Sequence, residues 1–317
     1  MKILLTGAAG FIGFHLAKRL QENNEIIGLD NINDYYDTKL KHDRLSILNQ
    51  NSNFKFFKID IVDYDELSKL VSSVKPDVII HLAAQAGVRY SIDNPFKYQK
   101  SNLEGFLNIL EICRQFNISK LVFASSSSVY GNSANEYFKE TDNVDHPISL
   151  YAATKKANEL MASTYTHLFG FQTIALRFFT VYGPYGRPDM AYFKFLNSLK
   201  ENRNIQIYNN GNLLRDFTYI DDIVDGIIKT LAYKPSGAHV FNLGNNKPVK
   251  LMDFISIIEK IYGKEFQKEF VEMQDGDVYK TAANIDLAIK ELNYKPTHTI
   301  DEGLTKFIEW YKEYYKC

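Results

Sequence analysis

Residues 1–13 read MKILLTGAAGFIG and join a short apolar run directly to a glycine-rich turn. The run Ile3–Thr6 has the composition of a buried strand, and the residues after the turn have helical spacing. Gly7, Gly10 and Gly13 form a Gly-x-x-Gly-x-x-Gly motif between the two. Glycines at such a turn let the backbone approach a pyrophosphate, which the N–H groups of the helix N-terminus then bind. The stretch predicts a dinucleotide site, and a plain tight connection is the alternative.

Two carboxylates follow at the ends of later strands. Asp30 lies about 20 residues after Gly10, where a carboxylate accepts hydrogen bonds from the adenosine ribose and repels a 2′-phosphate. This position favours NAD over NADP. Asp60 ends the next strand, from which a carboxylate can reach the adenine amino group. An ordinary cap of the strand end is the alternative for Asp60.

Short apolar runs alternate with segments of helical period in the first part of the chain, which is typical of a parallel sheet covered by helices. The predicted strands are Ile3–Thr6, Glu25–Leu29, Phe54–Lys58, Val78–His81, Leu121–Ser125 and Thr173–Leu176. The predicted helices are Phe11–Gln21, Thr38–Leu48, Asp65–Val71, Pro95–Phe116 and Leu150–Leu168. We therefore predict the α/β class, with a Rossmann-type doubly wound parallel sheet.

The pattern changes after about residue 177, where glycine, proline and asparagine become denser and the elements shorter. We expect residues 1–177 to form an NAD-binding domain. Residues 178–317 are expected to form mainly a smaller α/β substrate-binding region, with the chain crossing between the two.

Charge and cysteine content exclude several classes of protein. The chain has 37 Lys+Arg against 38 Asp+Glu, without the clustered basic excess that a nucleic-acid binder needs. No apolar run approaches the ~18 residues of a membrane span. Cys113 and Cys317 fit neither a disulfide framework nor a zinc spacing. We expect a cytoplasmic protein that binds neither membrane nor nucleic acid and uses no catalytic metal.

A tyrosine and a lysine one helical turn apart, in Tyr151-x-x-x-Lys155, are the candidate catalytic pair. A nearby cation lowers the pKa of a phenol, so that it can act as a base near neutral pH. A surface pair is the alternative, because this spacing alone is common. Serines 125–128 end the fifth predicted strand, where a parallel sheet places its site. No Gly-x-Ser-x-Gly elbow occurs, and His81 is expected to be a packed residue rather than a base.

Together these motifs resemble the extended short-chain dehydrogenase/reductases, in particular the nucleotide-sugar epimerases. Longer stretches are similar to the UDP-glucuronate 4-epimerases: DNINDYYD (30–37), HLAAQAGVRYS (81–91) and RFFTVYGPYGRPDMA (177–191). The resemblance extends from residue 7 to about 290. Tyr185 stands where the family often has Trp, and residues 275–279 read DGDVY where Pro-Gly-Asp-Val-Pro is more usual.

The resemblance implies a role for each matching position. The cofactor contacts would come from Gly7, Gly10, Phe11, Ile12, Gly13, Asp30, Asn31, Asp60, Ile61, Leu82, Ala83, Ala84, Tyr151, Lys155 and Phe178. The catalytic group would be Tyr151, Lys155, Ser126, Ser127 and Ser128, and the substrate contacts Arg89, Thr180, Arg187, Arg215 and Asp277.

In this scheme Tyr151 takes the proton of the sugar 4-hydroxyl and the C4 hydrogen passes to NAD⁺, which leaves a 4-keto sugar. Ser126 bridges the phenol and the 4-oxygen, while Lys155 holds the nicotinamide ribose and tunes Tyr151. Arg215 neutralises the diphosphate, and Asp277 holds the uridine ribose. Arg187 and Thr180 recognise the uronate carboxylate, and the alternative is that Arg187 pairs with phosphate or with Asp189.

Two other functions stay open at this point. One is 4-epimerisation of a neutral UDP-hexose or UDP-N-acetylhexosamine with the same residues, and the other is a non-catalytic NAD-binding regulator. Decarboxylases and 4,6-dehydratases are disfavoured because no acid stands among Ser126, Ser127 and Ser128. The resemblance also implies a homodimer formed by the helices near 95–116 and 150–168. Polysaccharide biosynthesis is the expected use of the product, although no residue pattern indicates the pathway.

The chain is rich in aromatic residues, with Tyr 21 and Phe 22. Six rings lie in the stretches that resemble the epimerases, and we expect some of them to line the cleft: Tyr35, Tyr36, Phe178, Phe179, Tyr182 and Tyr185.

Overall fold

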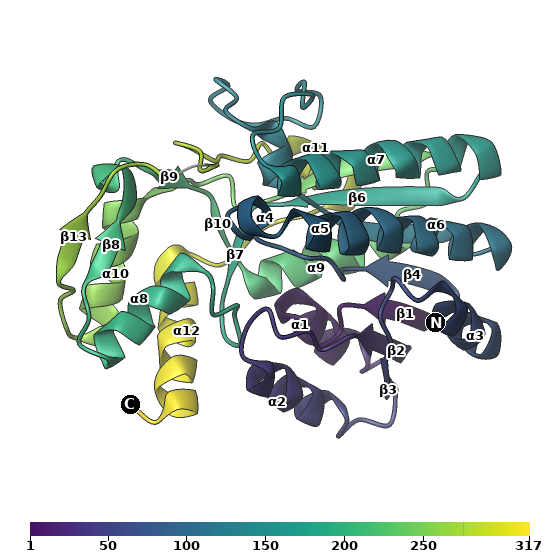
Figure 1. Cartoon of the computed structure of the whole chain (residues 1–317), viewed down its shortest axis with the longest axis horizontal. Helices are drawn as coiled ribbons and strands as arrows, with labels where there is room; N and C mark the ends of the chain where they lie inside the picture. The colour runs from purple at the N-terminus through teal and green to yellow at the C-terminus, as the bar shows by residue number, and fades with distance from the viewer. Residues whose placement is uncertain (275) are drawn as a thin grey trace.

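The computed structural model describes residues 1–274 and 276–317 and is built around one parallel sheet (Figure 1). The strand order is β11 (Ala238–Leu243), β6 (Gln172–Phe178), β5 (Lys120–Ser126), β4 (Val78–His81), β1 (Lys2–Thr6), β2 (Glu25–Asp30), β3 (Phe54–Lys58). The order reverses between β1 and β4, which both pair in parallel register. The predicted fold class is confirmed, and the switch point marks where a ligand crevice opens.

Alternation along the central strands gives the sheet two buried faces. On β1, Ile3 and Leu5 belong to one apolar cluster and Leu4 to the other, because successive side chains point to opposite faces. The first cluster is covered by α1 (Phe11–Leu20), α2 (Thr38–Leu48) and α9 (Ile220–Ala232). The second is covered by α3 (Tyr64–Val74), α6 (Gly105–Gln115) and α7 (Leu150–Phe169).

The six predicted strands are present, and the seventh strand, β11, was missed. It lies at the sheet edge beside β6, and its first half is exposed or half-buried, so it lacks a continuous apolar run. The helix expected over 95–116 is divided into α5 (Pro95–Tyr98), a π-helical turn η1 (Gln99–Glu104) and α6, after a short α4 (Tyr90–Asp93). The π turn aims Asn102 inward, where it accepts a bond from the Gln85 N–H at 2.8 Å and donates to its carbonyl at 3.0 Å.

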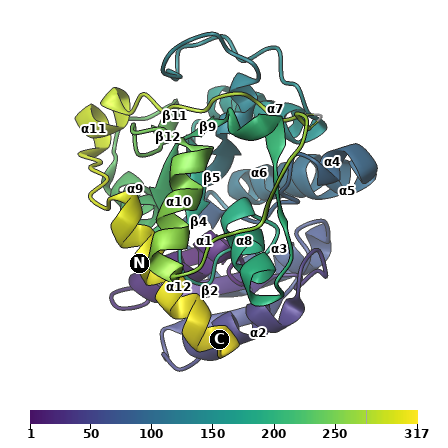
Figure 2. The same cartoon turned by 90° about the vertical axis from the view of Figure 1, so that its left-hand side faces the viewer.

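The rest of the chain forms small elements at one end of the sheet (Figures 1 and 2). Three two-stranded pairs are β7 (Thr180–Tyr182) with β10 (Phe217–Tyr219), β9 (Leu214–Arg215) with β12 (Val249–Lys250), and β8 (Ile205–Ile207) with β13 (Lys268–Phe270). The helices there are α8 (Ala191–Lys200), α10 (Leu251–Tyr262) and α12 (Ile300–Tyr315), with the 3₁₀ turn η3 (Tyr208–Gly211). Elsewhere, α11 (Asp286–Leu292) packs against β11 and α9, and the 3₁₀ turn η2 (Ser127–Tyr130) follows β5.

The chain crosses back to the sheet after the expected boundary at residue 177. Helix α9 packs against α1, and β11 extends the sheet before the chain returns to β12. The division into an NAD-binding domain at 1–177 and a substrate-binding region at 178–317 therefore stays a prediction, and part of the second range belongs to the sheet. We call the part formed by β7–β10, β12, β13, α8, α10 and α12 the cap.

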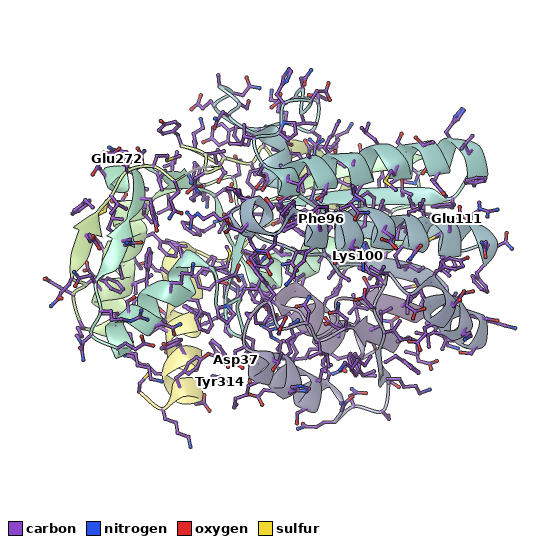
Figure 3. All side chains as sticks on the ribbon, viewed as in Figure 1. Asp37, Phe96, Lys100, Glu111, Glu272 and Tyr314 are labelled. Carbon is purple, nitrogen blue, oxygen red and sulfur yellow. The ribbon has the colours of Figure 1, made fainter. Side chains whose placement is uncertain are left out.

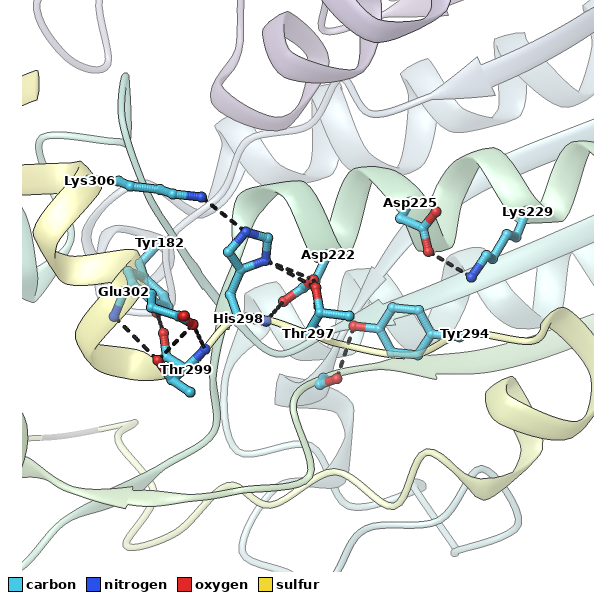
Figure 4. Close-up of polar contacts among 11 residues, drawn as sticks. Tyr182, Asp222, Asp225, Lys229, Tyr294, Thr297, His298, Thr299, Glu302 and Lys306 are labelled. Carbon is cyan, nitrogen blue, oxygen red and sulfur yellow. Dashed lines mark hydrogen bonds and ion pairs between the residues drawn. The ribbon is translucent and has the colours of Figure 1, made fainter.

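Helix α12 is joined to α9 by a buried carboxylate (Figure 4). Asp222 accepts hydrogen bonds from the N–H of Thr297 at 3.0 Å and from Nδ1 of His298 at 3.0 Å. Thr299 then caps α12, and Glu302 bonds back to the N–H of Thr299 at 2.9 Å. No described helix is long and apolar enough to cross a bilayer.

Candidate active site

A single cavity of about 1060 Å³ runs along the carboxyl edge of the sheet and under the cap. It is lined by every residue that the sequence assigns to the site: Gly7, Gly10, Phe11, Ile12, Gly13, Asp30, Asn31, Asp60, Ile61, Leu82, Ala83, Ala84, Arg89, Ser126, Ser127, Ser128, Tyr151, Lys155, Phe178, Thr180, Arg187, Arg215 and Asp277. The fold thus brings together residues 270 positions apart in sequence. Their individual roles remain proposals.

The glycine-rich loop forms a cradle that side chains would close. Gly7 has a φ of +74° and donates its N–H to the Leu29 carbonyl at 2.8 Å. A Cβ on Gly13 would lie 2.0 Å from the Gly7 carbonyl oxygen. Gly10 begins α1 without a side-chain cap, so the first N–H groups of the helix are free for an anion. This cradle fits the pyrophosphate of a dinucleotide.

The two strand-end carboxylates lie at the same edge of the cavity. Asp30 accepts from the Ile32 N–H at 2.8 Å, and the ammonium of Lys41 lies 3.9 Å from it. Asp60 accepts from the Val62 N–H at 3.0 Å and from the side chain of Asn31 at 2.9 Å. Asp60 therefore caps its own turn and also faces the cavity. Lys41 also lines the cavity but was not predicted from the sequence, because it is one of several polar residues on α2.

The catalytic candidates meet where β5 ends and α7 begins. Ser149 caps α7 by accepting from the Ala152 N–H at 3.1 Å, which fixes the first helical turn and Tyr151 within it. The hydroxyl of Ser126 accepts from the Ser128 N–H at 3.1 Å and donates to its hydroxyl at 2.9 Å. Burial raises the pKa of Tyr151, while the charge of Arg187 and the hydroxyl of Ser126 lower it.

Lys155 is buried beside the end of β5 and is held there by a backbone carbonyl group. Its ammonium donates to the Ala124 carbonyl at 2.8 Å, and burial lowers its pKa to about 8 although the charge of Glu159 raises it. The protein cation that lowers the pKa of Tyr151 is Arg187, and the role of Lys155 in tuning this phenol stays a prediction. Glu159 is held behind Lys155 by a buried ion pair with Arg177 at 2.8 Å.

Arg187 is paired within the protein. Its guanidinium makes two bonds to Asp189, at 3.0 and 2.5 Å, and the hydroxyl of Tyr35 donates to the same carboxylate at 3.0 Å. Burial raises the pKa of Asp189, but the charge and hydrogen bonds of Arg187 hold it below its ordinary value. The alternative that Arg187 pairs with Asp189 is thus what the structure shows. Asp189 and Tyr35 also line the cavity.

At the far end of the cavity Arg89 and Arg215 share one carboxylate. Arg215 lies 2.9 Å from Asp277 and donates to the Val278 carbonyl at 2.6 Å. Arg89 reaches the other oxygen of Asp277 at 3.2 Å. The net positive charge of this group suits a diphosphate. The sequence departure at 275–279 falls here, and Asp275 lies outside the described residues.

Several expectations about individual side chains can be checked directly. Tyr35, Tyr36, Phe178 and Phe179 line the cavity, whereas Tyr182 and Tyr185 are absent from its lining. His81 is buried as expected: it bonds to the Thr6 hydroxyl at 2.8 Å, and burial lowers its pKa to about 3.

Cys113, also buried, is an apolar filler on α6. Among residues 1–274 and 276–317, no three His, Cys, Asp or Glu side chains gather as metal ligands.

Known proteins share this architecture along the whole chain. The chain is 52% identical over 335 residues to "Protein CapI" of Staphylococcus aureus, with all of both chains covered. It is 47% identical to "UDP-glucuronate 4-epimerase 4" of Arabidopsis thaliana, over 99% of this chain and 76% of that protein.

Among solved structures, the UDP-glucuronic acid 4-epimerase of Bacillus cereus in complex with UDP-glucuronic acid and NAD superposes with a TM-score of 0.94. It is 37% identical, with 99% of this chain and all of that one covered. The model of the NAD dependent epimerase/dehydratase family matches residues 3–244. These similarities confirm the resemblance seen in the sequence, and the chain belongs to the NAD dependent epimerase/dehydratase family.

Proposed function

We propose that this protein is an NAD-dependent isomerase that interconverts UDP-glucuronate and UDP-galacturonate. The observation that carries the proposal is the placement of Tyr151, Ser126 and Arg187 around one point of the cavity. A phenol and a hydroxyl there serve oxidation of a sugar hydroxyl, and a guanidinium beside them serves a carboxylate on the same sugar.

The protein residues divide the binding of NAD and UDP-sugar between the two ends of the cavity. The Gly7–Gly13 loop and the N-terminus of α1 bind the dinucleotide pyrophosphate, with Asp30 on the adenosine ribose. Arg215 and Arg89 bind the diphosphate of the sugar nucleotide, and Asp277 orients both guanidinium groups.

When bound, NAD⁺ accepts a hydride from C4 of the sugar and returns it to either face of that carbon. Tyr151 removes the proton of the 4-hydroxyl, and Ser126 holds the 4-oxygen by a hydrogen bond. The charge of Arg187 stabilises the phenolate, which offsets part of the cost of burying it. Lys155, freed from the Ala124 carbonyl, binds the hydroxyls of the nicotinamide ribose. A 4-keto sugar results, and a cavity of about 1060 Å³ gives it room to turn about its diphosphate.

Recognition of the uronate rests on Arg187 and on Thr180, which lines the same part of the cavity. A 4-keto uronate is a β-keto acid and loses CO₂ easily. Serines 126–128 place no acid beside the phenol, so no side chain of this triplet donates a proton toward that side reaction.

The Arg187–Asp189 pair favours a second candidate, epimerisation of a neutral UDP-hexose or UDP-N-acetylhexosamine. Because Asp189 already compensates the guanidinium charge, a neutral sugar leaves no unpaired cation. A non-catalytic regulator would not require Tyr151 and Lys155 in the same cavity.

The test is to incubate purified protein with UDP-glucuronate and, in parallel, UDP-glucose, without added NAD, and to separate the products by chromatography. We expect UDP-galacturonate from the first and little change in the second. Turnover of UDP-glucose alone would replace the uronate assignment by the neutral one.

A double variant tests the carboxylate contact. Arg187→Gln with Asp189→Asn removes both charges and leaves no buried ion unpaired. We expect KM for UDP-glucuronate to rise by roughly 10- to 100-fold, as for a lost charge-assisted pair of 1.5–3 kcal/mol. An unchanged KM would assign Arg187 a structural role with Asp189.

We also propose a homodimer that acts in the cytoplasm and supplies galacturonate for polysaccharide biosynthesis. Large apolar side chains are exposed along α4–α7 (Figure 3 marks Phe96): Ile92, Phe96, Leu107, Leu150, Leu160, Leu168 and Phe169. Phe96 is 82% exposed and Leu160 57%. A second copy of this chain would cover this face. Leu160→Glu should yield a monomer in light scattering, while Ile289→Glu, on α11, should not.

A further inference from the structure

The segment that leads to Arg187 is held from outside the cavity. The carbonyl oxygen of Pro184 accepts a hydrogen bond from Nε2 of His15 at 2.8 Å. The next two carbonyl oxygens accept from Nη2 of Arg44, at 2.6 and 3.3 Å. Three consecutive carbonyl groups are thus fixed by two side chains. We call His15, Arg44 and the backbone of 184–186 the carbonyl anchor.

Arg44 also holds the cofactor loop. Its Nη1 donates to the Ala9 carbonyl at 2.8 Å and to the hydroxyl of Tyr36 at 2.8 Å. Ala9 lies between Gly7 and Gly10 of the glycine motif. One guanidinium therefore joins the loop that faces the pyrophosphate to the segment that presents Arg187.

Burying the guanidinium of Arg44 costs free energy, and the two segments that it joins are the reason we give for its burial. Its side chain is fully buried, and within the described residues it forms no ion pair with a carboxylate. Taking a cation out of water costs several kcal/mol, which carbonyl and hydroxyl oxygens repay only in part. A planar fork that reaches two segments at once is something that neither Lys nor an apolar side chain can supply.

His15 is suited to its part of the anchor. Burial, followed by the charges of Arg44 and Lys18, lowers its pKa to about 4 although the bond to Pro184 raises it. The ring is therefore neutral at pH 7. Since a carbonyl oxygen only accepts, Nε2 carries the proton and donates.

Packing around Tyr185 keeps the anchored segment in one conformation. Tyr185 has a φ of +54°, which is unfavourable for a residue with a Cβ. Its ring packs against Phe14 at 4.9 Å and Trp310 at 4.8 Å between ring centres. Helix α12 is in turn joined to α2 by the hydroxyl of Tyr314, which donates to Asp43; Figure 3 labels Tyr314 on α12.

We propose that Arg44, with His15, is a positioning residue for sugar recognition: the carbonyl anchor sets where Arg187 stands relative to Tyr151 and the cofactor loop. The inference rests on the proposed role of Arg187 in the proposed function. It assigns a task in the sugar site to two residues that do not line the cavity.

The test measures binding in the Tyr151→Phe protein, so that no turnover occurs. UDP-glucuronate reaches the sugar pocket, whereas UDP ends at the diphosphate and serves as the internal reference. Titration calorimetry should show that Arg44→Met weakens UDP-glucuronate about tenfold and UDP less than twofold. Arg44→Lys should show the same pattern with a smaller loss. Arg19→Met, an exposed arginine on α1, should change neither.

A double-variant comparison identifies the route of the effect. In the background of Arg187→Gln with Asp189→Asn, Arg44→Met should weaken UDP-glucuronate less than twofold. If Arg44→Met does not fold, His15→Phe is the substitute, because it removes the bond to Pro184 alone. It should weaken UDP-glucuronate binding relative to UDP binding by the same factor as Arg44→Lys.

If Arg44→Met weakened the binding of UDP-glucuronate and UDP equally, the positioning role of Arg44 would be overturned. The same holds if Arg44→Met weakened UDP-glucuronate binding just as much in the protein that carries Arg187→Gln and Asp189→Asn. Absence of UDP-glucuronate turnover in the unmodified protein would instead overturn the proposed function.

Discussion

The dinucleotide end and the cap of this molecule place their functional groups in different ways. At the dinucleotide end, backbone hydrogen bonds hold the loop that faces the cofactor. Gly7 donates to the Leu29 carbonyl and Gly10 donates to the Gly7 carbonyl, all within one βαβ unit. In the cap, a buried carboxylate gathers distant segments. Asp216 accepts from the N–H groups of Asn245 at 2.7 Å, and of Asn246 and Ala283 at 3.0 Å.

The difference concerns which substitutions each region tolerates. Backbone-built sites depend on glycine and on strand ends, and here Arg44 is the side chain that also holds the loop, through the Ala9 carbonyl. The arrangement around Asp216 depends on a single side chain, because its removal leaves one buried and two half-buried N–H groups without this acceptor. We expect the two regions to respond differently to point substitutions, and four predictions test this.

The largest effect should come from Tyr151→Phe. Loss of a general base lowers turnover by about 10²–10⁴-fold, whereas the cradle for NAD is untouched. Steady-state kinetics and the NAD content of the purified protein are the measurements. Tyr165→Phe, near the far end of α7, is the matched control and should retain turnover. Activity retained in Tyr151→Phe would remove this residue from its assigned role.

Asp216→Ala should give the largest loss of stability. The buried N–H of Ala283 costs about 1–3 kcal/mol when it loses its acceptor and the two half-buried N–H groups cost less, so we expect a loss of about 2–4 kcal/mol in urea unfolding. Asp216→Asn keeps one acceptor oxygen and should lose less. Asp221→Ala, an exposed residue in the first turn of α9, should stay within about 0.5 kcal/mol. A loss below about 1 kcal/mol in Asp216→Ala would mean that the backbone alone holds the cap.

Gly13→Ala tests the backbone-built end. The new Cβ would meet the Gly7 carbonyl at 2.0 Å, so the loop must move, at about 1–3 kcal/mol. The purified variant should also contain less NAD, read from absorbance after denaturation. Gly170→Ala meets nothing within 4 Å and should keep its NAD, with only the strain of its +79° φ. Equal NAD content in the two variants would contradict the cradle.

The smallest effect is the pH dependence of stability. His15 and His81 have native pKa values of about 4 and about 3, below the ordinary 6.5. Between pH 6.5 and 4 the unfolded chain therefore binds more protons, and stability falls as pH falls. Each histidine contributes about 1.4 kcal/mol per pH unit in that window. Unfolding at pH 7.5, 6 and 5 measures it. His81→Asn should lower the slope by that amount, and an unchanged slope would contradict the burial of a neutral ring.

The sequence predicts the dinucleotide end well because its information is local. The Gly7–Gly13 motif, the apolar runs and Asp30 lie within one βαβ unit, so their spacing reports their geometry. The assignment of the chain to the NAD-dependent epimerases, made from the sequence, is also confirmed. Strand β11 could not be found, because an edge strand needs no continuous apolar run.

The sequence predicts less about the sugar end. The pairing of Arg187 with Asp189 remained one of two alternatives, since spacing alone does not decide where a guanidinium points. The bonds from Tyr35 to Asp189 and from Arg44 to residues 185 and 186 join positions more than 140 apart. The contacts of His15 on α1 and Arg44 on α2 with this segment form only once the chain is folded.

The central claim is that C4 of the sugar is oxidised and reduced again without release of its hydrogen. The direct test is incubation of the purified protein, without added NAD, with UDP-glucuronate deuterated at C4. We predict UDP-galacturonate that retains the deuterium at C4, formed more slowly than from the unlabelled substrate. Loss of the deuterium to solvent, with UDP-galacturonate still formed, would contradict this mechanism.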